Sequence, residues 1–195
     1  MKSVKKQNVM IPKMEEVEQE KERLNNRRRF YKLLRNTTFT LLVVAAASVL
    51  IAFLLMPVLR VSGDSMEPTL KDQDVVLLVK TDHFETGELC GFYWQNKLLL
   101  KRIIAGPGDM VDIKDDGSVY VNGQELDEPY VTEKSLGDCD MEFPYQVPEN
   151  KYFVMGDHRS VSIDSRNSVI GCVDKSQMVG KIWIRVWPLK NLGSV

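Results

Sequence analysis

The chain has 195 residues, of which 44% are hydrophobic and 27% charged, and its formal net charge is −1. This length accommodates one domain of medium size with an additional segment, and excludes two full domains. A charge balance this close to neutral gives no indication of nucleic-acid binding. Three cysteines and two histidines are too few for a disulfide framework or a histidine-rich metal centre. We therefore expect no metal, at most one disulfide, and structural or incidental thiols at Cys90, Cys139 and Cys172.

Charge is distributed unevenly along the chain. Residues 1–36 contain 11 lysines and arginines against 5 acidic residues, a net charge of +6. Residues 57–195 contain 15 against 22, a net charge of −7. Between them, residues 37–56 (TTFTLLVVAAASVLIAFLLM) carry no charge. The opposite charges predict that the two parts lie in different compartments.

The uncharged run of 20 residues predicts a transmembrane helix. At about 1.5 Å per residue it spans about 30 Å, the thickness of a bilayer's hydrocarbon core. A cluster of basic residues precedes it and Arg60 alone follows it, so the positive-inside rule places the N-terminus in the cytoplasm. We expect a basic cytoplasmic tail at 1–36, near anionic lipid, a transmembrane anchor at 37–57 and an extracytoplasmic domain at 58–195.

Two other interpretations of this run fit the sequence less well. A buried core helix is expected to carry a polar stripe, whereas this run is apolar on all sides. A cleaved signal peptide has an apolar stretch of about 7–15 residues with small residues after it. Here the run is longer, and Ala45–Ala47 lie in its middle. We therefore predict a permanent, single-pass anchor.

Beyond the anchor the pattern changes to short runs of β-type residues between turn residues. Asp116-Gly117 and Asn122-Gly123 flank Val119–Val121, which predicts a pair of tight hairpins. This part has no amphipathic helical pattern and no βαβ rhythm, so we predict a mainly β, antiparallel domain. Residues 112–150 are more polar and rich in turns, and we interpret them as a non-catalytic elaboration. Four further runs predict strands: Val75–Val79, Leu98–Ile104, Tyr152–Met155 and Lys181–Trp187.

Ser62–Leu70 (SGDSMEPTL) is the first of three segments with candidate chemistry. Ser65 follows Gly63-Asp64 and lies eight residues beyond Pro57, a reach of at most about 26–29 Å in an extended chain. We therefore expect Ser65 close to the outer face of the membrane. A serine in such a turn is either a turn former or a nucleophile, and this segment by itself favours the turn former.

The second segment, Asn96–Asp109 (NKLLLKRIIAGPGD), has a lysine in a predicted strand. Because side chains alternate along a strand, Lys101 shares a face with the apolar Leu99 and Ile103. Burial on that face would lower the pKa of the lysine, and a neutral lysine can act as a general base toward a serine hydroxyl. The alternative is a solvated lysine on an edge strand, which the spacing alone favours.

The third segment, Gly156–Arg166 (GDHRSVSIDSR), directly follows a predicted strand. Its charged side chains and three serines predict a rigid loop held by ion pairs and hydroxyl hydrogen bonds. A polar surface turn is the alternative. The charged residues concerned are Asp157, Arg159, Asp164 and Arg166.

In this order, behind a single span, the three segments resemble the conserved boxes of bacterial type I signal peptidases, also called leader peptidases. The resemblance runs from the anchor through Pro188, and the single span is similar to the short members typical of Gram-positive bacteria. It implies a domain of coiled antiparallel sheets, with Ser65 as nucleophile and Lys101 as general base. It also implies that the backbone N–H of Ser65 donates to the oxyanion and that Ser162 orients Lys101. Five more residues fall on positions that brace the site or, for the last, shape its cleft: Asp157, Arg102, Asp164, Arg166 and Met66.

The chain departs from the family pattern at a few positions. Gly63 stands where some relatives have a serine that supplies a second oxyanion donor. His158 stands where asparagine is usual, and Ala105-Gly106 replaces a Gly-Leu pair. Lys101 argues for the bacterial type, since the eukaryotic branch has histidine there. A Ser–His–Asp triad would need His158 beside Asp157, an alternative that the three boxes disfavour.

The resemblance implies removal of signal peptides from secretory preproteins at the cell membrane, through an acyl-enzyme and without a metal or cofactor. Cleavage is expected after a small–x–small motif. Preproteins and membrane lipid are the expected partners, with no nucleic acid and no obligate protein partner. One alternative is another Ser–Lys self-processing protease, similar to self-cleaving transcriptional repressors, but those carry a DNA-binding domain. The other is a non-catalytic, membrane-anchored binding module, against which the intact Ser65 and Lys101 argue.

Overall fold

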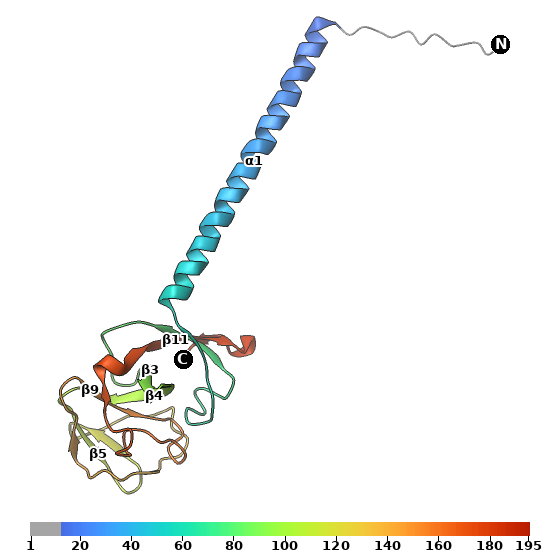
Figure 1. Cartoon of the computed structure of the whole chain (residues 1–195). Helices are drawn as coiled ribbons and strands as arrows, with labels where there is room; N and C mark the ends of the chain where they lie inside the picture. Colours follow the sequence, from blue (N-terminus) through green and yellow to red (C-terminus); the bar gives the residue numbers. More distant parts are fainter. Residues whose placement is uncertain (1–12) are drawn as a thin grey trace. The chain divides into compact units, whose positions relative to one another are not determined.

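The computed structural model describes residues 13–195, so the predicted tail at 1–36 lies partly outside the described residues. This part of the chain contains one long helix and a β domain, drawn in Figure 1.

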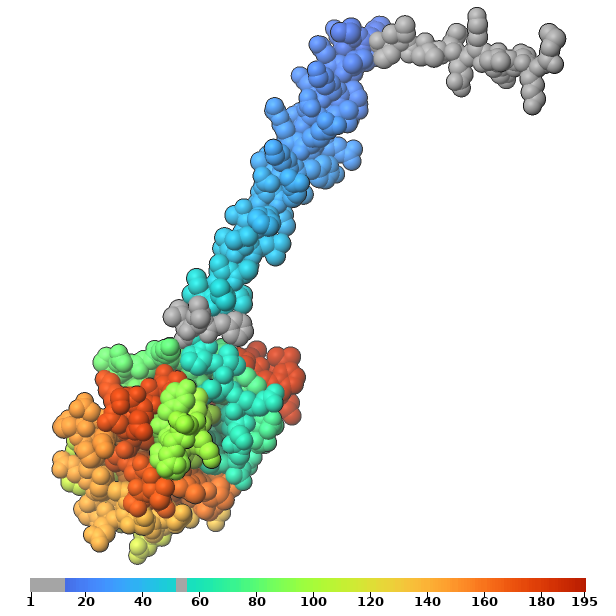
Figure 2. Space-filling model, viewed as in Figure 1, coloured from blue at the N-terminus to red at the C-terminus, as the bar shows by residue number. Residues whose placement is uncertain are grey.

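The helix α1 (Met14–Leu55) has 42 residues and includes almost the whole predicted span. Its side chains are exposed over residues 14–51 (Figure 2). Among the described residues it is the one helix long and apolar enough to cross a membrane, with a mean hydropathy of 1.6 in its most apolar window. A helix this long measures about 63 Å, roughly twice the hydrocarbon core. The basic segment before the span therefore continues the same helix.

The domain that follows is mainly β and antiparallel, as predicted. The larger sheet has eight strands, and the smaller sheet has four, in the order β7 (Gln124–Glu125), β6 (Val119–Val121), β5 (Met110–Ile113) and β8 (Tyr145–Gln146). The larger sheet has the order β1 (Val58–Arg60), β2 (Val75–Val79), β11 (Met178–Trp187), β3 (Leu89–Trp94), β4 (Lys97–Ala105), β9 (Lys151–Met155) and β10 (Val173–Asp174), and β12 (Gly193–Ser194) pairs with β11.

The predicted strands are all present. β2 and β6 have the predicted bounds. β4 extends its predicted range by one residue at each end, and β9 begins one residue earlier than predicted. β11 begins earlier than predicted, at Met178, because it continues across Gly180. A side chain at Gly180 would lie 2.3 Å from the carbonyl oxygen of Val79, so only glycine allows this pairing. The only helices after residue 60 are two short 3₁₀ helices, η1 (Lys175–Gln177) and η2 (Leu189–Asn191).

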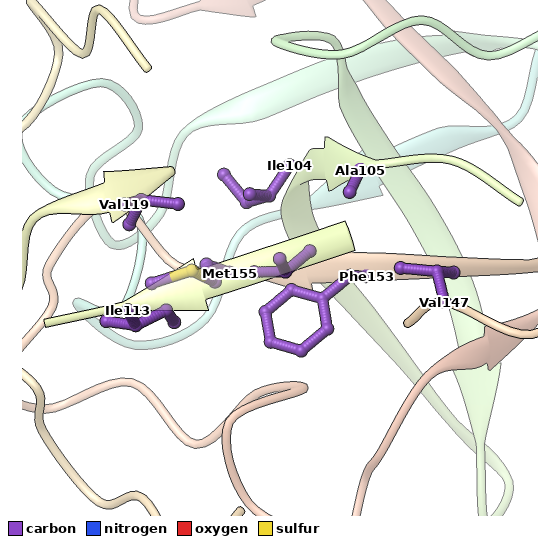
Figure 3. Packing of buried hydrophobic residues seen from close by; sticks show 8 residues of the cluster. Ile104, Ala105, Ile113, Val119, Val147, Phe153 and Met155 are labelled. Atoms are coloured by element: carbon purple, nitrogen blue, oxygen red, sulfur yellow. The ribbon is translucent and has the colours of Figure 1, made fainter. Parts of the chain in front are cut away.

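The core consists of three apolar clusters that meet at β4. One cluster joins the two sheets, as Figure 3 shows, so residues 112–150 share a core with the strand that carries Lys101. The second lies between β1, β2 and β11, and the third between β3, β4 and β9. Because β4 contributes to all three, its position is fixed from both faces. The side chains labelled in Figure 3 are Ile104, Ala105, Ile113, Val119, Val147, Phe153 and Met155.

Candidate active site

Ser65 lies in the connection between β1 and β2. Its neighbour Met66 and the nearby Leu70 are buried in the second cluster, which anchors the turn to the core. The amide of Leu70 donates to the carbonyl oxygen of Met66 at 2.9 Å, and the amide of Gly63 donates to Asp72 at 3.0 Å. Gly63 has φ +91°, a left-handed conformation that favours glycine. Ser65 itself stays partly exposed.

Lys101 projects from β4 toward this turn. Its side chain is buried, with 4% of the residue exposed, and its Nζ lies 2.9 Å from both Ser65 Oγ and Ser162 Oγ. Burial lowers its pKa to about 8, and the positive charge of Arg166 acts in the same direction. Asp164 and Asp157 oppose this shift. The amine therefore reaches its neutral form within the range in which a base can take the serine proton.

Ser162 comes from the third segment and is also buried. Its amide donates to the carbonyl oxygen of His158 at 3.1 Å, so the loop backbone fixes its position. Gly156 packs closely beside it: a Cβ there would lie 2.2 Å from Ser162 Oγ and 2.5 Å from the carbonyl oxygen of Ser65. The absence of a side chain at Gly156 thus lets the third segment approach the first.

Three buried ion pairs involve the third segment, two of them through Asp157 and Asp164. Arg102 donates to Asp157 through Nε at 2.8 Å and Nη2 at 2.6 Å. Asp157 also accepts a hydrogen bond from the Thr69 hydroxyl, which ties the first segment to the pair. Bidentate pairs of this kind fix orientation as well as charge. The three segments are therefore joined through a single carboxylate.

The second ion pair lies within the third segment. Arg166 donates to Asp164 at 2.8 and 2.9 Å, and both residues are fully buried. Burial opposes ionisation of Asp164, but the hydrogen bonds and charge of Arg166 outweigh it and lower the pKa of that carboxyl. Asp164 also accepts from the amide of Gly156 at 2.9 Å. A charged Asp164 therefore holds the backbone that contacts Ser162 and Ser65.

The structure thus brings together all the residues that the sequence predicts for the site. His158 is close too, but its ring Nδ1 lies 3.3 Å from the carbonyl oxygen of Asp64, and its amide donates to the carbonyl oxygen of Ser65 at 3.1 Å. These contacts support the turn, whereas it is Lys101 that contacts the Ser65 hydroxyl. Sequence reasoning missed Thr69 and Gly156, whose roles depend on contacts between segments far apart in the chain.

A cleft of about 160 Å³ opens beside Ser65 and Lys101. Its walls come from β1 and the residues after it on one side, and from β4 on the other. Figure 2 shows the hollow between the turquoise and light-green parts of the surface. Apolar walls with a few placed polar groups, here including Ser65 and Lys101, are typical of ligand sites in proteins. The apolar lining residues are Leu59, Val61, Met66, Leu98, Leu99 and Leu100.

Comparison with known proteins identifies the family. The family model for signal peptidase, peptidase S26, matches residues 33–187. Signal peptidase I of Bacillus licheniformis is 38% identical over 72% of this chain and 81% of that protein. Signal peptidase IB of Staphylococcus aureus is 36% identical over 74% of this chain and 88% of that protein. A crystal structure of a signal peptidase I from Enterococcus faecalis, 28% identical, covers 51% of this chain and 96% of that chain with a TM-score of 0.42.

These matches show a serine endopeptidase of the peptidase S26 family. Within it, the chain belongs to the bacterial type I signal peptidases, as the three boxes predict.

The pH profile of hydrolysis tests the state of Lys101. Because the base must be deprotonated and burial lowers its pKa to about 8, kcat/KM should rise with pH through that value. Initial rates on a signal-sequence peptide between pH 6 and 10 give the profile. We call this rise of kcat/KM with pH the alkaline limb of the profile. A limb with its midpoint near the ordinary pKa of histidine, about 6.5, would instead indicate a histidine base.

His158→Asn separates the two candidate bases. A Ser–His enzyme that loses its histidine loses several orders of magnitude in rate. We expect this variant to keep kcat/KM within about tenfold, or about 1.4 kcal/mol in barrier, because His158 supports only the turn. Its alkaline limb should stay where it is in the wild type. If a folded His158→Asn variant lost its activity, and its kcat/KM no longer rose with pH through about 8, His158 would be the base.

Proposed function

We propose that this chain removes signal peptides from secretory preproteins by means of a Ser65–Lys101 dyad. The observation that carries the proposal is the 2.9 Å contact between the Lys101 amine and the Ser65 hydroxyl, in a buried site that lowers the pKa of the lysine to about 8. A buried lysine beside a serine has few structural advantages, since burial disfavours its charged form. Activation of the hydroxyl accounts for the arrangement.

Acylation begins when Ser65 Oγ attacks the scissile carbonyl carbon and its proton passes to the neutral Lys101 Nζ. The carbonyl oxygen becomes an oxyanion, which accepts a hydrogen bond from the backbone N–H of Ser65. The tetrahedral intermediate then collapses: the C–N bond breaks, and Lys101 gives its proton to the leaving amine nitrogen. An ester between the signal peptide and Ser65 remains.

Deacylation repeats these steps with water. Lys101, again neutral, takes a proton from a water molecule that attacks the ester carbonyl, and then returns it to Ser65 Oγ as the ester bond breaks. Ser162 hydrogen-bonds to Lys101 at 2.9 Å and keeps its amine directed at Ser65 in both halves of the reaction. Arg102, Asp157, Asp164 and Arg166 hold the loop in place, and Met66 forms part of the cleft wall.

The cleft supports cleavage after a small–x–small motif. Its leucine, valine and methionine walls suit small apolar side chains next to the dyad. The enzyme would act on preproteins still held in the bilayer by their apolar signal segment. An anchor in the same bilayer raises the effective concentration of the enzyme near that substrate.

The proposed topology follows from the charges around the span. Residues 1–36 form the basic cytoplasmic tail, residues 37–57 the anchor and residues 58–195 the extracytoplasmic protease domain. The helical continuation of the anchor toward its N-terminus carries arginines that favour contact with anionic lipid.

Ser65→Ala and Lys101→Met test the dyad. Each should lower the rate of preprotein processing by several orders of magnitude, because neither residue functions without the other. Ser160→Ala and Lys97→Met are the matched controls, since both residues are exposed and Lys97 lies on the same strand as Lys101. The readout is the new N-terminus of a cleaved preprotein, with circular dichroism as a check of folding. Near-normal turnover by either dyad variant would refute the proposed mechanism.

Protease protection tests the topology. In intact protoplasts, an added protease should remove an epitope placed after Val195 and leave one placed before Met1, because the positive flank stays in the cytoplasm. Permeabilised cells, in which both epitopes are digested, serve as the control. The opposite pattern would reverse the orientation and place Ser65 on the cytoplasmic side.

A further inference from the structure

Residues 126–137, called the strap below, lie in the polar stretch between β7 and β8. Glu128 in the strap is buried. Its carboxylate accepts hydrogen bonds from both terminal nitrogens of Arg159, one of them at 3.1 Å. Arg159 has only 1% of its surface exposed. A buried guanidinium needs a paired carboxylate, because removal of one partner leaves an uncompensated charge. Glu128 is therefore the group that allows Arg159 to occupy the interior.

Arg159 in turn connects the strap to the active site. Its Nε donates to the carbonyl oxygen of Gly156 at 3.1 Å. Gly156 is the residue that packs against both Ser162 Oγ and the carbonyl oxygen of Ser65. A shift of Arg159 would therefore move the backbone that supports Ser162, which contacts the Lys101 amine.

Tyr130 provides a second connection from the same strap. Its ring lies over the guanidinium of Arg102, 3.7 Å from the ring centroid, and its hydroxyl donates to Glu128 at 3.2 Å. Burial raises the pKa of Tyr130, so the hydroxyl stays a neutral donor. Arg102 is thereby enclosed between Asp157 and an aromatic face. The strap thus contacts both Arg102 and Arg159.

The far end of the strap is fixed to the same loop. Arg166 Nη1 donates to the carbonyl oxygens of Ser135 at 3.1 Å and Leu136 at 2.7 Å. A Cβ at Gly137 would lie 2.4 Å from the carbonyl oxygen of Arg159, and its φ of +62° also favours glycine. Leu126 and Leu136 pack against the cluster between the two sheets. The strap is therefore attached at both ends and in the middle.

We infer that the strap positions the catalytic groups, with Glu128 and Tyr130 as positioning residues that act through Arg159 and Arg102. Glu128 neutralises Arg159 and holds it against Gly156, while Tyr130 keeps Arg102 on Asp157. The inference rests on the proposed Ser65–Lys101 dyad and gives a catalytic purpose to part of a segment that the sequence alone presents as an elaboration.

Glu128→Gln gives the sharpest test, measured on the full-length chain in detergent with a small–x–small peptide. Loss of the carboxylate leaves the charge of Arg159 unpaired on the loop that carries Ser162, next to the carbonyl oxygen of Gly156. The charged or titratable groups that act on Lys101 in the wild type are Asp164, Arg166, Asp157 and Cys90. Added positive charge disfavours the ammonium form, so the alkaline limb should move to lower pH. We expect kcat to fall about tenfold, or about 1.4 kcal/mol in barrier. The matched control is Glu125→Gln, whose carboxylate forms an exposed ion pair with Lys134.

A double variant, Glu128→Gln with Arg159→Met, removes both charges and should return the limb to the wild-type pH. Tyr130→Phe and Tyr130→Leu give an independent comparison, which holds even if Glu128→Gln does not fold. The phenylalanine keeps the ring over Arg102 and should retain most of the activity, whereas leucine should lose about as much as Glu128→Gln.

A purely structural strap would give a different result. Glu128→Gln would then lower the melting temperature but leave kcat and the limb of the folded enzyme equal to those of Glu125→Gln, and Tyr130→Phe would match Tyr130→Leu. Either finding would overturn the inference alone. Ser65→Ala is assayed alongside: cleavage by that variant would overturn the proposed function, and the inference with it.

Discussion

The burial of the Lys101 amine beside Ser65 is the constraint on which the rest of the domain depends. An ammonium group in a protein interior is unfavourable, so burial lowers the pKa of the lysine to about 8, and as a neutral amine it can hydrogen-bond to hydroxyl groups. That state requires a buried environment, in which Lys101 is only 4% exposed. Three apolar clusters meeting at β4 provide it, and two hydroxyl groups at 2.9 Å complete it.

The ion pairs around Lys101 neutralise two carboxylates that would otherwise favour its protonated form. Asp157 and Asp164 organise the third segment through hydrogen bonds to Thr69 and Gly156. Unpaired, these carboxylates would favour the protonated lysine and remove the base. Arg102 and Arg166 pair with them, so the carboxylates can hold the loop while the amine stays neutral. The same reasoning extends to Glu128, which prevents Arg159 from adding an excess of positive charge.

Much of this architecture is predictable from the sequence because it is local. Turn residues predict the hairpin around Val119–Val121, and β-type runs predict the main strands. Alternation along β4 places Lys101 on an apolar face, but its burial depends on contacts with Ser65 and Ser162 from distant segments. Glu128 could not be found in this way, since it lies 31 residues from Arg159 and no periodicity relates the two. Nor does composition reveal that α1 continues unbroken from the charged segment into the apolar span, because helix propensity and hydrophobicity vary independently there.

A direct titration of Lys101 tests the central claim. With lysine ¹³Cε-labelled protein in detergent, and Lys101→Met to assign the signal, the chemical shift of this one carbon reports the protonation of its amine. Burial predicts a midpoint at about pH 8. A midpoint near 10.5, the ordinary value for lysine, would mean that the amine is charged throughout the working range and is not the base.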